Sequence, residues 1–165
     1  MPSVTGRASA APDQPVAFVL GGGGHLGAHE VGMLRALLEA GVDPDLVVGT
    51  SVGALNGAVV AADPTPRAVR TLTRLWAAIG DQAIFGGSVL GRVVTFARTR
   101  THAHSSEPLR EMLLETFGDQ RIEHLARPFQ CVAASIERAS EHWFTSGPLV
   151  DALLASTAVP GVLPP

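Results

Sequence analysis

The chain has 165 residues, enough for one domain with a hydrophobic core and too few for two. Hydrophobic residues make up 46% of the chain and charged residues 16%, which excludes an intrinsically disordered protein. The formal net charge of −3 offers no basic excess for a nucleic-acid backbone, so we expect no nucleic-acid partner.

The cysteine content and the hydropathy of the chain limit the cellular compartments that we expect for the protein. The single cysteine, Cys131, cannot form an internal disulfide, which favours a reducing, cytoplasmic compartment. The first residues lack the apolar core of a signal peptide, and no stretch reaches about 18 apolar residues, so no transmembrane helix is expected. Peripheral contact with a membrane stays open as an alternative.

The first predicted unit is a strand, a glycine loop and a helix. Residues 1–14 are small and polar and predict a flexible leader, so the domain is assigned to residues 15–165. Residues 16–20 are a continuous apolar run, which predicts a strand buried on both faces. From Gly27 apolar residues recur at helical spacing until Gly41, where a left-handed glycine is expected to end the helix.

The second unit repeats this order. Residues 46–48 are apolar, and residues 54–62 are small, apolar and uncharged, which predicts a strand and a helix buried on most sides. Residues 67–79 carry an apolar stripe and an arginine-bearing face, as a covering helix does.

The remaining elements complete an α/β pattern. Residues 80–104 show no clear period, and a helix is predicted from Ser106 to Phe117, before Gly118. Apolar runs then predict strands at 129–136 and 142–145 and a helix at 148–156. Strands that alternate with helices indicate a layered α/β fold with a mainly parallel sheet.

The most specific local motif is Gly49-Thr50-Ser51-Val52-Gly53, a G-x-S-x-G between a predicted strand and a predicted helix. In a nucleophile elbow the serine takes a strained conformation that exposes its hydroxyl, and the flanking glycines let strand and helix approach closely. The alternative is a glycine turn in which Ser51 only caps the helix.

The glycine loop before the first helix is the second motif. Its backbone N–H groups lie at the positive end of a helix and could stabilise an oxyanion if the loop lies beside Ser51. The run Gly22-Gly23-Gly24-His25-Leu26-Gly27 also fits the dinucleotide-binding pattern G-x-G-x-x-G. That site needs an acidic residue at the end of the second strand, where this chain has Gly49-Thr50-Ser51 instead. No Gly-Lys-Ser/Thr is present, which argues against a phosphate-binding P-loop.

With both motifs in this order, residues 16–62 resemble the patatin-like phospholipases. Residues 155–160, followed by Pro164-Pro165, resemble the family segment that precedes its last catalytic motif. The resemblance implies a three-layer α/β/α sandwich with a mainly parallel sheet. It also implies hydrolysis of a lipid or other carboxylic ester, without a cofactor.

The resemblance implies a Ser-Asp dyad. Ser51 is then the catalytic nucleophile, and Gly49 and Gly53 form the elbow. The backbone N–H groups expected to form the oxyanion hole are those of Gly22, Gly23, Gly24 and Val52. A departure is Leu26, where the family often has arginine, so a cationic contact to phosphate is lost.

The family aspartate belongs to an Asp-Gly-Gly or Asp-Gly-Ala motif, and no aspartate in this chain is followed by glycine. Asp151 precedes the proline-rich segment and does not match it. We therefore expect the N-terminal part of a longer hydrolase. The alternative is a short, catalytically silent lipid-binding or regulatory domain.

Other groups of residues give weaker evidence for a functional site. His102 and His104 form an H-x-H pair, but without nearby cysteines or carboxylates beyond Glu107 we interpret it as solvated loop and predict no metal site. Residues 84–100 mix apolar residues with arginines, which fits a covering surface segment better than a lipid-contacting lid. Cys131 is expected to be inert packing. The oligomeric state does not follow from the sequence.

A conventional triad would pair Ser51 with a histidine and a second aspartate. The chain order permits His142 or His124 with Asp81 or Asp119, but nothing local supports it, and the dyad is preferred.

Overall fold

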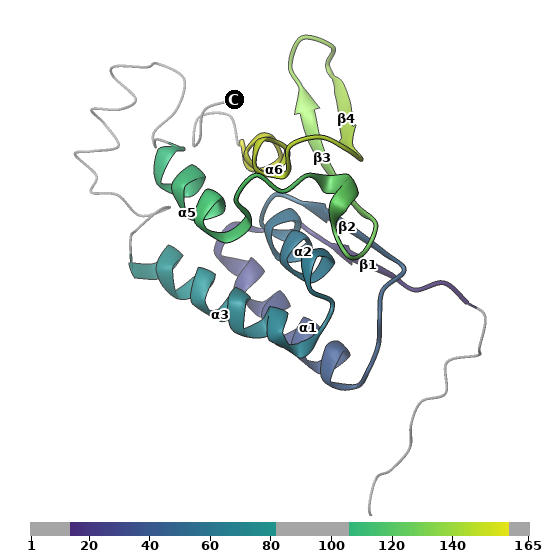
Figure 1. The fold of residues 1–165 in the computed structure, drawn as a ribbon. Coiled ribbons are helices and arrows are strands. Elements are labelled where there is room, and N and C mark those ends of the chain that lie inside the picture. Colours follow the sequence, from purple (N-terminus) through teal and green to yellow (C-terminus); the bar gives the residue numbers. More distant parts are fainter. Residues whose placement is uncertain (1–13, 82–105, 159–165) are drawn as a thin grey trace, which may run out of the picture.

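The computed structural model describes residues 14–81 and 106–158. Its elements follow the predicted order of strands and helices (Figure 1). They are β1 (Ala17–Leu20), η1 (Gly24–Leu26), α1 (Gly27–Glu39), β2 (Leu46–Thr50), α2 (Val52–Ala62), α3 (Pro66–Asp81), α5 (Glu107–Phe117), η2 (Ile122–His124), β3 (Phe129–Ser135), β4 (Ser140–Phe144) and α6 (Leu149–Thr157).

The four described strands form one sheet in the order β1-β2-β3-β4. The first three strands are parallel, and β4 returns antiparallel to β3. In this register Phe18 pairs with Val47, and Val47 pairs with Phe129. With the five α-helices of the described residues, this mainly parallel sheet confirms the α/β class and is consistent with an α/β/α fold.

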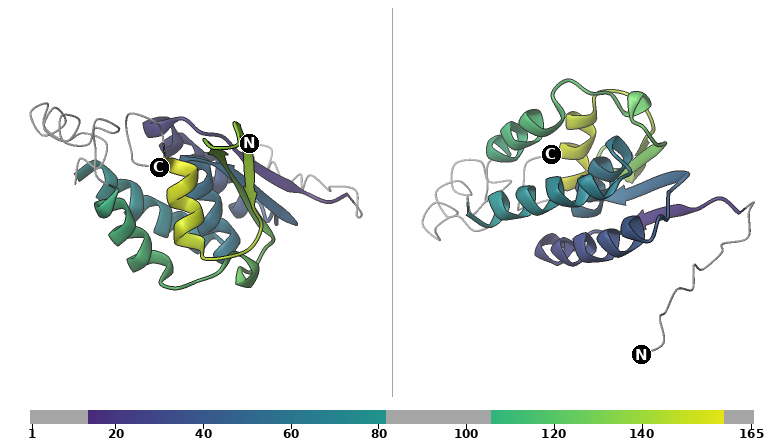
Figure 2. Two further views of the ribbon diagram at one scale, coloured as in Figure 1. Left: turned by 90° about the horizontal axis from the view of Figure 1, so that it is seen from above. Right: turned by 60° about the horizontal axis from the view of Figure 1, so that its bottom comes forward.

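The strand order decides which face of the sheet the described helices cover. Each successive parallel strand is added on the same side, and right-handed crossovers then bring the connecting helices to the same face. That face carries the buried side chains of Phe18, Val47, Phe129 and Cys131. Figure 2 shows α2, α3, α5 and α6 gathered on one side of the strands.

The prediction that residues 16–20 form a strand buried on both faces is wrong for the described part of the chain. Phe18 is buried, whereas 74% of Val19, which points to the opposite face, is exposed. On the same face of β4, 48% of Trp143 is exposed. An apolar run shows that a strand is apolar on both sides, but only the placement of the helices decides which side is covered.

The helix α2 is the centre of the core. Residues 52–61 are all buried, as their small and uncharged side chains predict. At Gly57 an added Cβ would lie 2.9 Å from Val47 Cγ1 and 3.3 Å from the Phe129 ring, so the helix lies close against the sheet. Among the described helices, none is both long and apolar enough to cross a bilayer.

Glycines end two helices as expected. Gly41 has φ +76°, its N–H donates to Leu38 O, and the N–H of Val42 donates to Leu37 O, which together form a Schellman motif after α1. Gly118 follows α5 with φ +59°. The predicted limits of the other elements differ from the observed ones by one or two residues.

Candidate active site

Ser51 lies in the turn between the last residue of β2 and the first residue of α2. Its backbone has φ +55° and ψ −123°, a left-handed conformation that residues with a side chain rarely adopt. Such a conformation costs on the order of 1–3 kcal/mol and persists only where the surrounding structure holds it. The turn is therefore strained at the residue that the motif singles out.

The hydroxyl of Ser51 does not cap α2. Ser51 occupies the N-cap position, but its side chain forms no capping hydrogen bond. Within residues 14–81 and 106–158 its Oγ has no hydrogen-bond partner at all, and the residue is half-buried. The capping alternative is thereby contradicted, and the hydroxyl remains available to a ligand.

The glycines on either side of Ser51 are required by close backbone contact. A Cβ added at Gly49 would lie 2.4 Å from Ala54 Cα, and one added at Gly53 would lie 2.3 Å from the carbonyl oxygen of Leu20. No side chain fits at such distances, because the neighbours are backbone atoms that cannot turn away. The strand and the helix meet here as the G-x-S-x-G pattern predicts.

The glycine loop lies against this turn. A Cβ added at Gly22 would be 3.4 Å from Ser51 Cβ and 3.6 Å from the carbonyl oxygen of Thr50. Gly23 and Gly24 follow, the latter with φ +57°, and the chain then passes through η1 into α1. The loop is exposed and precedes a helix, where backbone N–H groups create a positive end.

Ser156 is a site residue that the sequence motifs did not indicate individually. It lies near the end of α6, and only 8% of it is exposed. Its Oγ accepts a hydrogen bond from the N–H of Ser51 at 2.9 Å and donates one to the carbonyl oxygen of Val132 at 2.7 Å. The only local signal was its place in the segment of residues 155–160, because the contact joins residues 105 positions apart.

Asn56 is a second residue that the motifs missed. Its side-chain amide is buried and donates to the carbonyl oxygen of Gly27 at 2.9 Å and to a Glu30 carboxylate oxygen at 2.8 Å. Its Oδ1 accepts from Trp76 Nε1 at 2.9 Å. These bonds connect the helix after Ser51 to α1, which continues the glycine loop, and to α3.

None of the aspartates that the sequence analysis considered is joined to Ser51 by a hydrogen bond in the described structure. Asp151 is exposed on α6, where it accepts a hydrogen bond from Arg110 at 3.3 Å. Asp119 is also exposed, and no hydrogen bond joins either carboxylate to Ser51. The side chain of Asp81 lies outside the described residues.

The histidines do not assemble a triad in the described part of the chain. His142 is exposed on β4, and its ring contacts that of Phe144 edge to face. His124 is exposed in η2. The pair His102 and His104 and the segment 84–100 lie outside the described residues.

Cys131 is part of the core, as predicted. It is completely buried on β3, and its Sγ lies 3.8 Å from the carbonyl oxygen of Ala152 on α6. Burial raises the pKa of its thiol to about 12, because the charged thiolate cannot be solvated there. The thiol is therefore unreactive in the folded chain.

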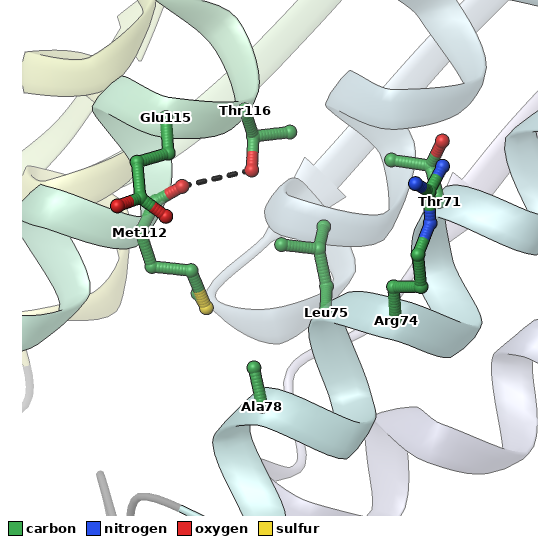
Figure 3. Close-up of a pocket in the computed structure, with 7 residues that line it drawn as sticks. All are labelled: Thr71, Arg74, Leu75, Ala78, Met112, Glu115 and Thr116. Carbon is green, nitrogen blue, oxygen red and sulfur yellow. Dashed lines mark hydrogen bonds between the residues drawn. The ribbon is translucent and has the colours of Figure 1, made fainter.

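A groove of about 390 Å³ separates α3 from α5 (Figure 3). Leu75 and Ala78 line one wall, and Met112 points into the groove from the other. Thr116 at its edge donates a hydrogen bond to the carbonyl oxygen of Met112. The lining includes neither Ser51 nor a glycine of the loop, so the groove is separate from the Ser51 site.

Comparison with known proteins gives a consistent result. A family model described as patatin-like phospholipase matches residues 18–165. Over 150 residues the chain is 31% identical to patatin-like phospholipase domain-containing protein 7 of Rattus norvegicus and 33% identical to patatin-like phospholipase domain-containing protein 6 of Homo sapiens. Over 156 residues it is 33% identical to lysophospholipase nte1 of Aspergillus terreus.

Each match covers 91% of this chain but only 11%, 10% and 9%, respectively, of the relative. The chain thus spans about a tenth of the length of the curated relatives that it matches.

Proposed function

Because this chain belongs to the patatin-like phospholipase family, we propose that it carries the nucleophile of a serine hydrolase that acts on lipid or other carboxylic esters. The observation that carries the proposal is the position of Ser51. Its hydroxyl is without a protein partner among the described residues, in a strained turn, with Gly22 beside it. The name lysophospholipase borne by one relative supports a lipid substrate.

In the proposed reaction Ser51 Oγ attacks the acyl carbonyl carbon while a base removes its proton. The new C–O bond turns the carbonyl oxygen into an oxyanion, which the N–H groups of the glycine loop and of Val52 stabilise. Loss of one such donor typically costs about 3 kcal/mol of transition-state stabilisation. The carbon–oxygen bond to the leaving alcohol breaks, and that alcohol takes the proton. Water then hydrolyses the acyl-enzyme, releases the carboxylic acid and restores the Ser51 hydroxyl.

The proposed base is an aspartate that this sequence does not contain. No aspartate in the chain is followed by glycine, and no described aspartate forms a hydrogen bond with Ser51. The proposal therefore assigns the nucleophile and the oxyanion donors to this chain and the base of a Ser-Asp dyad to an Asp-Gly-Gly or Asp-Gly-Ala motif.

A fluorophosphonate probe tests the nucleophile without requiring turnover. We expect covalent labelling at Ser51, mapped by peptide mass spectrometry, and no labelling of Ser51→Ala. Ser135→Ala is the matched control, because Ser135 is half-buried at the end of β3 and, in the part of the chain that the structure describes, its hydroxyl bonds only Glu137. This variant is expected to be labelled like the wild type.

Absence of labelling in a sample that unfolds cooperatively would contradict the proposed function and favour the catalytically silent lipid-binding domain. Slower fluorophosphonate labelling of Ser51 in the presence of lysophosphatidylcholine would extend the result from an activated serine to a lipid ligand, without requiring the base for turnover. Peripheral membrane contact belongs to the same proposal, and sedimentation with phospholipid vesicles measures it.

A further inference from the structure

We propose that Ser156 is a positioning residue that holds the backbone of Ser51 in the conformation required for attack. Its hydroxyl accepts from the N–H of Ser51 at 2.9 Å and donates to the carbonyl oxygen of Val132 at 2.7 Å. The hydroxyl of Ser156 thus acts as a donor and as an acceptor at the same time. The catalytic meaning of this contact rests on the proposed function, whereas the contact itself does not.

The strained turn needs a group that holds it. Gly49 and Gly53 permit the close approach of strand and helix, but they make no side-chain bond that fixes φ and ψ of Ser51. Helical hydrogen bonding uses the carbonyl oxygen of Ser51, which accepts from Ala54 and Leu55. It leaves the N–H of Ser51 without a partner in α2, because N-terminal N–H groups have no acceptor in their own helix.

Ser156 supplies that acceptor from the end of another helix. Thr50 is the last residue of β2 and pairs with Val132 of β3, and at Ser51 the chain leaves the sheet. The hydroxyl of Ser156 is inserted between the freed N–H and the carbonyl of Val132. It therefore links the two strands at the point where direct pairing ends.

Loss of this hydroxyl removes the acceptor of the Ser51 N–H and a donor to the carbonyl oxygen of Val132, close to the buried side chain of Ser156. An unsatisfied donor shielded from solvent is costly, so the turn is expected to relax until the N–H of Ser51 reaches water. A shift of Ser51 changes the direction of its Oγ, and small errors in the position of a nucleophile reduce rates strongly. Substrate binding elsewhere is unaffected, so the effect falls on kcat more than on KM.

The hydrogen bond between Ser51 and Ser156 also determines which backbone N–H groups remain free to bind an oxyanion. Because the N–H of Ser51 is directed to Ser156, it does not contribute to an oxyanion hole. The N–H of Val52 and those of the glycine loop are left for that role. Ser156 thus separates the backbone group that holds the turn from those that face the substrate.

The experiment compares Ser156→Ala with Thr157→Val in the full chain. Both residues are buried on α6, and each substitution removes one hydroxyl. Among the described residues, Thr157 Oγ1 donates only to the carbonyl oxygens of Leu153 and Leu154 in its own helix. Thr157→Val therefore controls for loss of a buried hydroxyl that does not contact the Ser51 turn.

The first readout is hydrogen–deuterium exchange of the Ser51 amide, measured by NMR. Loss of its acceptor is expected to accelerate exchange by about tenfold in Ser156→Ala, whereas Thr157→Val retains the protection of the wild type. Ser156→Thr keeps a hydroxyl and is expected to restore protection. Unchanged protection in Ser156→Ala overturns the proposal.

The second readout is the rate constant for fluorophosphonate labelling of Ser51. We expect a decrease of at least about tenfold in Ser156→Ala and a change within about twofold in Thr157→Val. Equal rates in Ser156→Ala and the wild type overturn the positioning role and leave the proposed function intact. A wild-type chain that resists the probe contradicts the proposed function, and the amide exchange of Ser51 then still decides whether Ser156 holds the turn.

Folding is checked by near-ultraviolet circular dichroism. Should Ser156→Ala fail to fold, Ser156→Cys replaces it, because a thiol has nearly the same shape but is a weaker donor and acceptor. Its labelling rate and amide protection are expected to lie between those of the wild type and of a chain without the bond. Wild-type values for both would overturn the proposal.

Discussion

At the scale of single residues, the glycines of this chain differ sharply in whether they tolerate a side chain. Gly53 faces the carbonyl oxygen of Leu20 at a distance that excludes any Cβ. Gly32, in the middle of α1, is exposed and has no atom within 4 Å of an added Cβ. The first glycine is required by close contact between two backbones, and the second is not.

Gly53→Ala is therefore expected to lower the free energy of unfolding by about 3 kcal/mol, because the added methyl forces backbone atoms apart. Urea denaturation measures the change. The matched control, Gly32→Ala, is expected to raise the same quantity by about 0.5–1 kcal/mol through its better helix propensity. Equal stability of the two variants would contradict the close contact at Gly53.

At the scale of elements, a buried amide joins the three helices around the site. Asn56 on α2 bonds the carbonyl oxygen of Gly27 and the carboxylate of Glu30 on α1, and it accepts from Trp76 on α3. The sequence of α2 is otherwise small and apolar, so this side chain is the polar exception in a buried helix. Its bonds fix the helix that follows the glycine loop against the helix that follows Ser51.

We expect Asn56→Ala to lower the free energy of unfolding by about 3 kcal/mol, since three partners lose a hydrogen bond at once. It is also expected to slow the labelling of Ser51, because the glycine loop loses its support. Thr73→Ala on α3 removes an exposed hydroxyl whose one bond within the described structure goes to Val69 O, and it should change stability by less than about 0.5 kcal/mol. Similar decreases in the free energy of unfolding for both variants would show that the buried amide contributes no more to stability than the exposed hydroxyl.

At the scale of the whole molecule, the burial of Cys131 makes the free energy of unfolding depend on pH in the alkaline range. The sequence contains neither lysine nor tyrosine, so Cys131 is the side chain that ionises between the ordinary ranges of histidine and arginine. In the unfolded chain the thiol loses its proton near its ordinary pKa of 9.0, but in the folded chain only near 12. Between these values the unfolded state binds fewer protons, so it gains stability relative to the folded state as pH rises.

The free energy of unfolding is therefore expected to fall as pH rises from about 9 to about 12 and to be constant with respect to this group below that window. Cys131→Ala should unfold more easily at neutral pH but lose this slope. Urea denaturation across the window measures both. A slope that persists in Cys131→Ala would contradict the assignment to the thiol.

Local patterns in the sequence were sufficient for the order of strands and helices, the helix ends at Gly41 and Gly118, and the G-x-S-x-G turn after β2. Each of these features depends on residues that are neighbours in the chain. A glycine that must adopt a positive φ or a serine between a strand and a helix carries its signal within a few positions.

The tertiary structure alone decided which face of the sheet the described helices cover, that the glycine loop lies beside Ser51, and that Ser156 and Asn56 hold this arrangement. The hydrogen bond from Ser51 to Ser156 joins residues 105 positions apart, and the exposure of Val19 depends on where the chain places its helices. Hydrophobic periodicity predicts that a surface is buried but not which surface meets it. Contacts between distant residues follow from the packing of the whole chain, and no local pattern of residue types encodes them.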